Sequence, residues 1–111
     1  MLNADKYTYR ITWSEEDQEF VGLCAEFPSL SWLEEKQDEA FNGIRKLVAD
    51  VLQDMENTNE KIPVPLALHS FSGKFMTRIP PEQHRRLAIE AREQGVSLNR
   101  LASERLTRHG Y

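Results

Sequence analysis

The first 26 residues contain two candidate strands, and in the first of them, residues 7–13, apolar and polar positions alternate. Residues 7–13 (YTYRITW) are rich in aromatic and β-branched side chains, and residues 19–26 (EFVGLCAE) follow a polar turn at residues 14–18. This order predicts a hairpin. Residues 30–33 are a candidate for a short third strand.

Beyond the third candidate strand, the apolar positions recur in steps of three and four, which predicts a long amphipathic helix. The helix opens at Glu34 and Glu35 and ends at residues 57–60. Its apolar face contains Ala40, Phe41, Ile44, Leu47, Val48, Val51, Leu52 and Met55. Residues 62–65 (IPVP) cannot form a central strand because each proline lacks the amide donor, so we expect an extended exit from the helix.

The C-terminal part of the pattern predicts a short strand and two helices. Residues 74–79 (KFMTRI) alternate, and Pro81 suits the first turn of a helix that reaches about residue 94. Gly95 supplies a left-handed stop, and Ser97 is a good N-cap for the second helix. The inner faces of the two helices contain Leu87, Ala88, Ala91, Leu98, Leu101, Ala102 and Leu106.

Composition narrows the class of protein. The chain has 111 residues, 40% of them hydrophobic, which suits one ordinary domain or two very small ones. No apolar run approaches the ~20 residues of a membrane-spanning helix, and residues 1–6 lack the apolar core of a secretory signal. The single cysteine, Cys24, excludes an internal disulfide and a cysteine-based zinc site. We expect a cytoplasmic protein with no metal and no cofactor.

Charge divides the chain into two parts of opposite sign. Residues 1–66 hold 6 Lys and Arg against 14 Asp and Glu, a net charge of −8. Residues 67–111 hold 8 Lys and Arg against 4 Glu, a net charge of +4. The basic part favours nucleic acid, and the acidic part favours a basic protein or no partner at all.

One strand and two helices in roughly 35 residues are too few to bury a core alone. With no metal or disulfide available, the remaining solution is an antiparallel ribbon formed by residues 74–79 of two copies across a twofold axis. Residues 74–80 (KFMTRIP), then a helix, then residues 95–99 (GVSLN) together resemble the ribbon-helix-helix family of DNA-binding proteins. The expected dimer core contains Phe75, Thr77, Ile79, Leu87, Ala91, Leu98, Leu101 and Leu106.

Alternation along residues 74–79 also selects the side chains that would face DNA. The outer face contains Lys74, Met76 and Arg78, and a two-stranded ribbon fits the major groove. By resemblance, these three match the base-reading positions of ribbon-helix-helix repressors. Arg78 could bind guanine through two hydrogen bonds, and Met76 could touch a thymine methyl. In the alternative interpretation, Lys74 and Arg78 form only a solvated edge that deters aggregation.

The start of the second C-terminal helix is expected to contact phosphate, because its amide donors are available there. The residues concerned are Ser97, Leu98, Asn99 and Arg100, and the last of them adds a positive charge. Five other arginines are interpreted as ordinary surface charges: Arg85, Arg86, Arg92, Arg105 and Arg108.

Taken together, the chain resembles the HicB antitoxins of bacterial toxin–antitoxin pairs, from about residue 7 to residue 106. The matching stretches are YRITW (9–13), FVGLCAEFPSL (20–30), QDEA (37–40) and IPVP (62–65). The resemblance implies an α+β fold with three parts: a partial RNase H-like βββα module (1–66), a linker (67–73) and a ribbon-helix-helix βαα module (74–111).

The same resemblance implies an antitoxin that binds and neutralises a HicA-type toxin, a small basic protein that cleaves mRNA. It also implies repression of its own operon through operator DNA, bound as a homodimer or a higher oligomer. The acidic first module would attract such a toxin, although its acidity could equally serve solubility alone. The sequence indicates no particular toxin-contacting residues.

Two further expectations concern what the chain lacks. An RNase H-like nuclease needs several carboxylates around Mg²⁺, whereas residues 7–13 carry none and Glu26 stands alone near the end of its strand. We therefore expect no enzymatic activity. Large apolar residues of the first module, Trp13, Phe27 and Trp32, and also Cys24, are interpreted as core.

An alternative function remains open at this point. The chain could be a stand-alone ribbon-helix-helix transcription regulator whose N-terminal module senses another ligand or protein. An adjacent gene for a small basic protein would distinguish the two.

Overall fold

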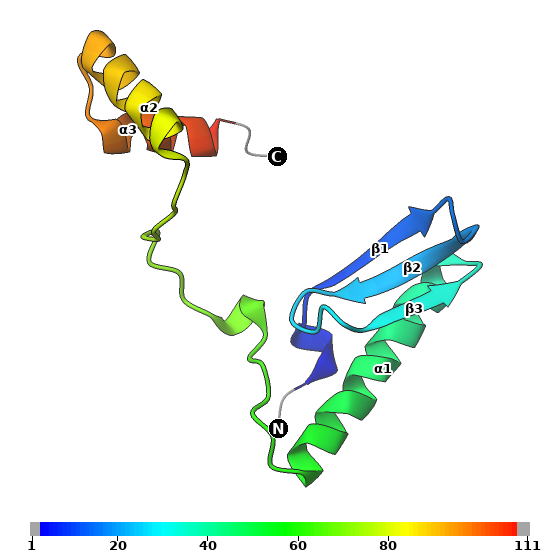
Figure 1. Ribbon diagram of the computed structural model, residues 1–111. Coiled ribbons are helices and arrows are strands. Elements are labelled where there is room, and N and C mark those ends of the chain that lie inside the picture. Colours follow the sequence, from blue (N-terminus) through cyan, green and yellow to red (C-terminus); the bar gives the residue numbers. More distant parts are fainter. Residues whose placement is uncertain (1–2, 109–111) are drawn as a thin grey trace. The chain divides into compact units, whose positions relative to one another are not determined.

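The computed structural model describes residues 3–108 and divides the chain into two compact units, Met1–Ser72 and Gly73–Tyr111 (Figure 1). Residues 1–2 and 109–111, which lie at the outer ends of the two expected modules, are outside the described residues. Three strands and three α-helices make an α+β protein, as predicted. Among the described residues, no helix is long and apolar enough to cross a membrane.

The first unit contains an antiparallel sheet in the order β1-β2-β3. Its strands are β1 (Tyr9–Ser14), β2 (Glu19–Cys24) and β3 (Ser31–Glu34). The hairpin and the third strand are confirmed, with ends displaced by one or two residues from the predicted ones. Gln18 closes the β1–β2 turn with a left-handed φ of 54°.

A single helix, α1 (Gln37–Asn57), covers one face of the sheet (Figure 1). Its buried positions are Ala40, Ile44, Val48 and Leu52, every fourth residue, as its periodicity predicted. Gly22 makes the close approach possible, because a Cβ there would lie 2.7 Å from the carbonyl oxygen of Ala40. The helix begins two residues after the predicted start, and Lys36 at its N-cap provides no side-chain cap.

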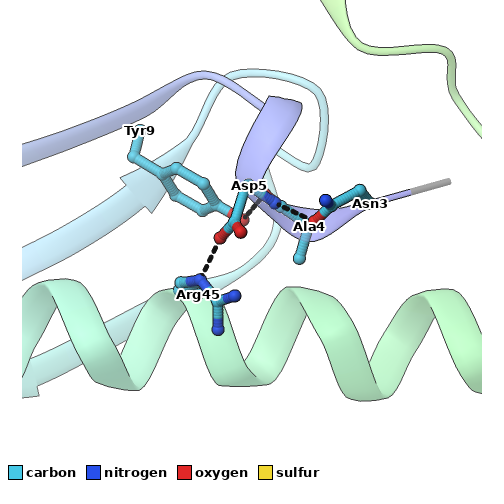
Figure 2. A network of polar contacts seen from close by, with 5 residues as sticks. All are labelled: Asn3, Ala4, Asp5, Tyr9 and Arg45. Carbon is cyan, nitrogen blue, oxygen red and sulfur yellow. Dashed lines mark hydrogen bonds and ion pairs between the residues drawn. The ribbon is translucent and has the colours of Figure 1, made fainter.

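A short 3₁₀ segment, Ala4–Lys6, is tied to α1 and β1 by side-chain contacts (Figure 2). Arg45 forms an ion pair with Asp5, and the Tyr9 hydroxyl donates to the Ala4 carbonyl oxygen at 2.7 Å. The hydrogen bond from Arg45 lowers the pKa of Asp5. Burial raises the pKa of Tyr9 to about 12, so its hydroxyl remains a donor across the physiological range.

The two tryptophans correct the sequence interpretation, which assigned them to the core. Trp13 is 44% exposed and Trp32 is 39% exposed, whereas Phe27 and Cys24 are buried as expected. Both tryptophans lie on edge strands, and one helix cannot cover the full width of the sheet. The Trp32 ring lies against Gly43 of α1, where any Cβ would collide with it.

The chain leaves the first unit through an extended segment that two side chains hold in place. The Tyr7 hydroxyl donates to the Pro63 carbonyl oxygen at 2.6 Å, and the Leu66 amide donates to Glu26 Oε2 at 2.8 Å. Pro65 between them is buried. Residues 62–65 form no strand, as predicted, and the expected linker begins with a 3₁₀ turn at Leu66–Leu68.

The second unit contains two helices, α2 (Pro81–Gln94) and α3 (Leu98–Thr107). The expected stop and start signals are both confirmed. Gly95 ends α2 with a left-handed φ of 70°, and the Ser97 side chain accepts a hydrogen bond from the Arg100 amide at 3.0 Å. Ala91 and Leu101 are buried where the helices meet.

Candidate DNA-binding and dimerisation site

Residues 74–79, expected to form the ribbon strand, make no strand within the chain. The segment is extended and exposed, and Phe75 and Met76 keep 76% and 86% of their surface accessible. The sequence predicted that this strand is completed by a second copy, so the ribbon itself stays a prediction. The segment is neither helical nor buried, which are the two outcomes that contradict a ribbon.

An open apolar groove of about 600 Å³ lies between this segment and the helices of the second unit. Six of the residues expected in the dimer core line it: Phe75, Thr77, Ile79, Leu87, Leu98 and Leu106. The other two, Ala91 and Leu101, are buried in the same unit. One chain therefore brings the expected core residues together but leaves three large apolar side chains, Phe75, Ile79 and Leu106, exposed to solvent.

The three expected base-reading residues, Lys74, Met76 and Arg78, are exposed. Their neighbours on the expected inner face, Phe75, Thr77 and Ile79, are exposed as well. Every residue from 71 to 86 is exposed, so the expected alternation between an inner and an outer face is not visible in burial. Lys74 and Met76 line the same groove as Phe75, while Arg78 is not among the groove residues. The assignment of these three side chains to DNA bases stays a prediction.

The expected phosphate contact lies at the start of α3. The Ser97 cap uses the Arg100 amide, so the amides of Leu98 and Asn99 are the donors that remain available at this helix end. The Arg100 side chain is paired with Glu104 at 3.4 Å on the exposed surface. Such an exposed pair is weak, and a phosphate could compete with Glu104 for the guanidinium.

Other arginines of the second unit take part in ion pairs between helical residues. Arg105 of α3 pairs with Glu90 of α2 and links the two helices, and Arg86 pairs with Glu82 along α2 at 3.9 Å. These contacts agree with the interpretation of Arg86 and Arg105 as surface charges.

No set of three or more His, Cys, Asp or Glu residues suited to a metal ion occurs among residues 3–108. Cys24, the single cysteine, is buried, and burial raises the pKa of its thiol. A raised pKa favours the neutral thiol, which is a poor nucleophile.

The sequence interpretation missed the side chains that hold the exit segment, Tyr7 and Glu26. Glu26 also accepts hydrogen bonds from the amide and the hydroxyl of Thr8, both at 3.0 Å. A lone carboxylate after a strand was the available signal, but its partner Leu66 lies 40 residues further along the chain. No local pattern could have identified that pairing.

Residues 58–106 match the family model described as the HicB family. The matched region begins at the end of α1 and includes the exit segment, α2 and nearly all of α3. It supports the similarity to HicB proteins that the sequence indicated. Searches of curated proteins and of solved structures found no match.

Proposed function

We propose that the chain is a HicB-type antitoxin that neutralises a HicA-type, mRNA-cleaving toxin and represses its own operon. The observation that carries this proposal is the match of residues 58–106 to the HicB family. In this proposal the chain acts in the cytoplasm, where both the mRNA and the operator are located.

The second unit is proposed to be a ribbon-helix-helix module that dimerises and binds operator DNA. Its apolar groove and the exposed side chains of Phe75 and Ile79 support dimerisation, because a second copy would cover them. Lys74, Met76 and Arg78 are then the proposed base contacts, and the start of α3 is the proposed phosphate contact.

The first unit is proposed to be the toxin-binding module. Its three antiparallel strands and single covering helix are compatible with a partial RNase H-like fold. The −8 charge of residues 1–66 complements a basic toxin. We propose that this unit acts by covering the toxin and has no catalytic role of its own.

Co-expression with the product of the neighbouring gene, followed by a growth-rescue assay, tests the antitoxin role. The proposal requires that the neighbouring gene encode a small basic protein, that this protein arrest growth alone, and that the full chain restore growth. Operator binding is measured in parallel by mobility shift with the promoter fragment of the same operon. If the chain fails to restore growth but still binds the promoter fragment with sequence specificity, the antitoxin role is wrong and the repressor role stands.

One observation favours a second candidate, a stand-alone transcription regulator. The family match excludes residues 1–57 and therefore the entire sheet of the first unit. In that case the first unit senses a different ligand or protein, and no toxic neighbour exists.

A further inference from the structure

The sheet of the first unit has a second face, opposite α1, that carries three neighbouring apolar side chains. Gly22 and Trp32 contact α1, so the alternate positions of β2 and β3 point to the other side. Val21 pairs with Leu33 in the register, and Leu23 is the next residue on this side of β2. We call this surface, centred on Val21, Leu23 and Leu33, the open sheet face.

No helix of the first unit covers the open sheet face among the described residues. Leu33 is 43% exposed, and neither Val21 nor Leu23 belongs to the cluster that packs around Ile44. Residues 20–24 of β2 (FVGLC) are nevertheless apolar on both sides. A continuous apolar run is typical of a strand that is covered on both faces, whereas a solvated face alternates with polar residues. The sequence of β2 therefore indicates a missing cover.

The chemistry at one end of this face indicates what covers it. Because the strands are antiparallel, the end of β1, the start of β2 and the end of β3 lie together. Six carboxylates occur in these segments and in the turn between β1 and β2: Glu15, Glu16, Asp17, Glu19, Glu34 and Glu35.

Two of these carboxylates are held by the exposed tryptophans. The Trp13 indole N–H donates to Glu15 at 2.7 Å, and the Trp32 indole N–H donates to Glu34 at 2.8 Å. The hydrogen bond from Trp13, with a second from Gln18, lowers the pKa of Glu15. By alternation Trp13, Trp32 and Glu34 share the α1 side of the sheet, whereas Glu19 shares the open sheet face with Val21 and Leu23. Apolar side chains bordered by negative charge complement a cationic protein surface.

We propose that the open sheet face binds a small basic protein, with Val21, Leu23 and Leu33 at the centre of the contact and the acidic end of the sheet facing the partner's cationic surface. This inference rests on the proposed function, because the basic protein is the toxin invoked there. It names the surface of the first unit that takes the toxin. A second copy of the chain is a poorer occupant, because two units of charge −8 would meet face to face.

The test uses the full chain and the purified protein encoded by the neighbouring gene, with binding measured by calorimetry. Leu33→Arg places a positive charge and a longer side chain at the centre of the contact. We expect Kd to rise about 30-fold or more, as for loss of a central interface anchor. Leu68→Arg is the matched control and should bind like wild type. Leu68 is an exposed leucine of the same unit, in the 3₁₀ turn that follows the exit segment.

A second pair of variants tests the charge. Asp17→Lys at the acidic end should slow association several-fold and flatten its dependence on salt. Glu56→Lys at the far end of α1 reverses the same charge away from the open sheet face and should leave both quantities unchanged. Circular dichroism establishes that each variant is folded.

The outcomes separate the two levels of the proposal. A wild-type chain that binds no neighbouring protein overturns the antitoxin role and this inference together. A wild-type complex that Leu33→Arg and Asp17→Lys leave intact overturns only the docking surface. Leu33→Arg could instead change the oligomeric state of the isolated chain without loss of partner binding. That result assigns the open sheet face to a second copy and also overturns the proposed docking surface.

Discussion

The two units of the chain bury their apolar side chains to different extents. The first unit has a connected core that includes Tyr7, Ile44 and Val48, closed by one sheet and one helix. In the described part of the second unit only Ala91 and Leu101 are buried, and an apolar groove stays open beside them. The first unit therefore encloses a core with its own residues, whereas the second unit leaves its groove open, which is why we propose that a second copy completes it.

The largest expected effect tests this dependence. Leu101→Asp places an unpaired charge between α2 and α3, at a cost of about 3–5 kcal/mol. We expect the dimer and operator binding to be lost, as measured by light scattering and mobility shift. The fluorescence melting curve should not change, because Trp13 and Trp32 both lie in the first unit.

Gln94→Asp, at an exposed position in the last turn of α2 that does not line the groove, is the control for Leu101→Asp and should stay dimeric. A dimeric Leu101→Asp protein that still binds the operator would show that this side chain is not part of the dimer core.

The converse experiment perturbs only the first unit. Gly22→Val directs a side chain into the Ala40 carbonyl and the Ile44 side chain, and we expect a loss of about 1–3 kcal/mol in the free energy of unfolding. Urea denaturation followed by tryptophan fluorescence measures the loss. Thr12→Val on β1, whose side chain points away from α1, is the control. Loss of operator binding in Gly22→Val would contradict the independence of the two units.

Arg78→Ala separates the two proposed functions. We expect operator binding to weaken by about 1–3 kcal/mol with a relaxed sequence preference, because one base contact is removed. Growth rescue should survive, since the first unit is unchanged. Arg92→Ala, in the last turn of α2, is the matched control. If Arg78→Ala abolishes growth rescue as well, the division of labour between the units is wrong.

The smallest expected effect concerns pH and the anchor at Glu26. Burial raises the pKa of Glu26, but hydrogen bonds from the Leu66 and Thr8 amides outweigh it, and the net pKa lies below the ordinary value of 4.5. The anchor therefore stabilises the fold fully above about pH 4.5, and this contribution is lost as the pH falls through the lower folded-state pKa. Between pH 6 and pH 3, roughly the window set by this linkage, the urea midpoint should fall less in Glu26→Gln than in wild type. Equal falls would show that Glu26 does not contribute.

Local signals predicted most of the elements, because each is encoded by a short pattern. The hairpin, the apolar face of α1, the Gly95 stop and the Ser97 cap all follow from neighbouring residues. Exposure of Trp13 was not predicted, because alternation tells which face of a sheet a side chain takes but not how far a covering helix extends.

The candidate site could be predicted in part for the same reason. Helical periodicity placed Leu87 on the inner face of one helix and Leu98 and Leu106 on the inner face of the next, and the structure brings them to one groove. The ribbon was predicted from the alternation of residues 74–79, but it would require contacts between two chains and therefore stays a prediction. The open sheet face had one readable signal, the continuous apolar run of β2, which the sequence interpretation did not use.

The hydrogen bonds that hold Pro63 and Leu66 determine where the connection to the second unit starts. Without these hydrogen bonds, the connection between the units would begin at Asn57, where α1 ends. With them, the connection begins only after Leu66. The reach of a flexible connection grows with the square root of its length, and the local concentration of one linked module around the other falls as that reach increases. If the first unit holds a toxin and the second an operator, as proposed above, Tyr7 and Glu26 shorten the stretch of chain that joins the two bound partners.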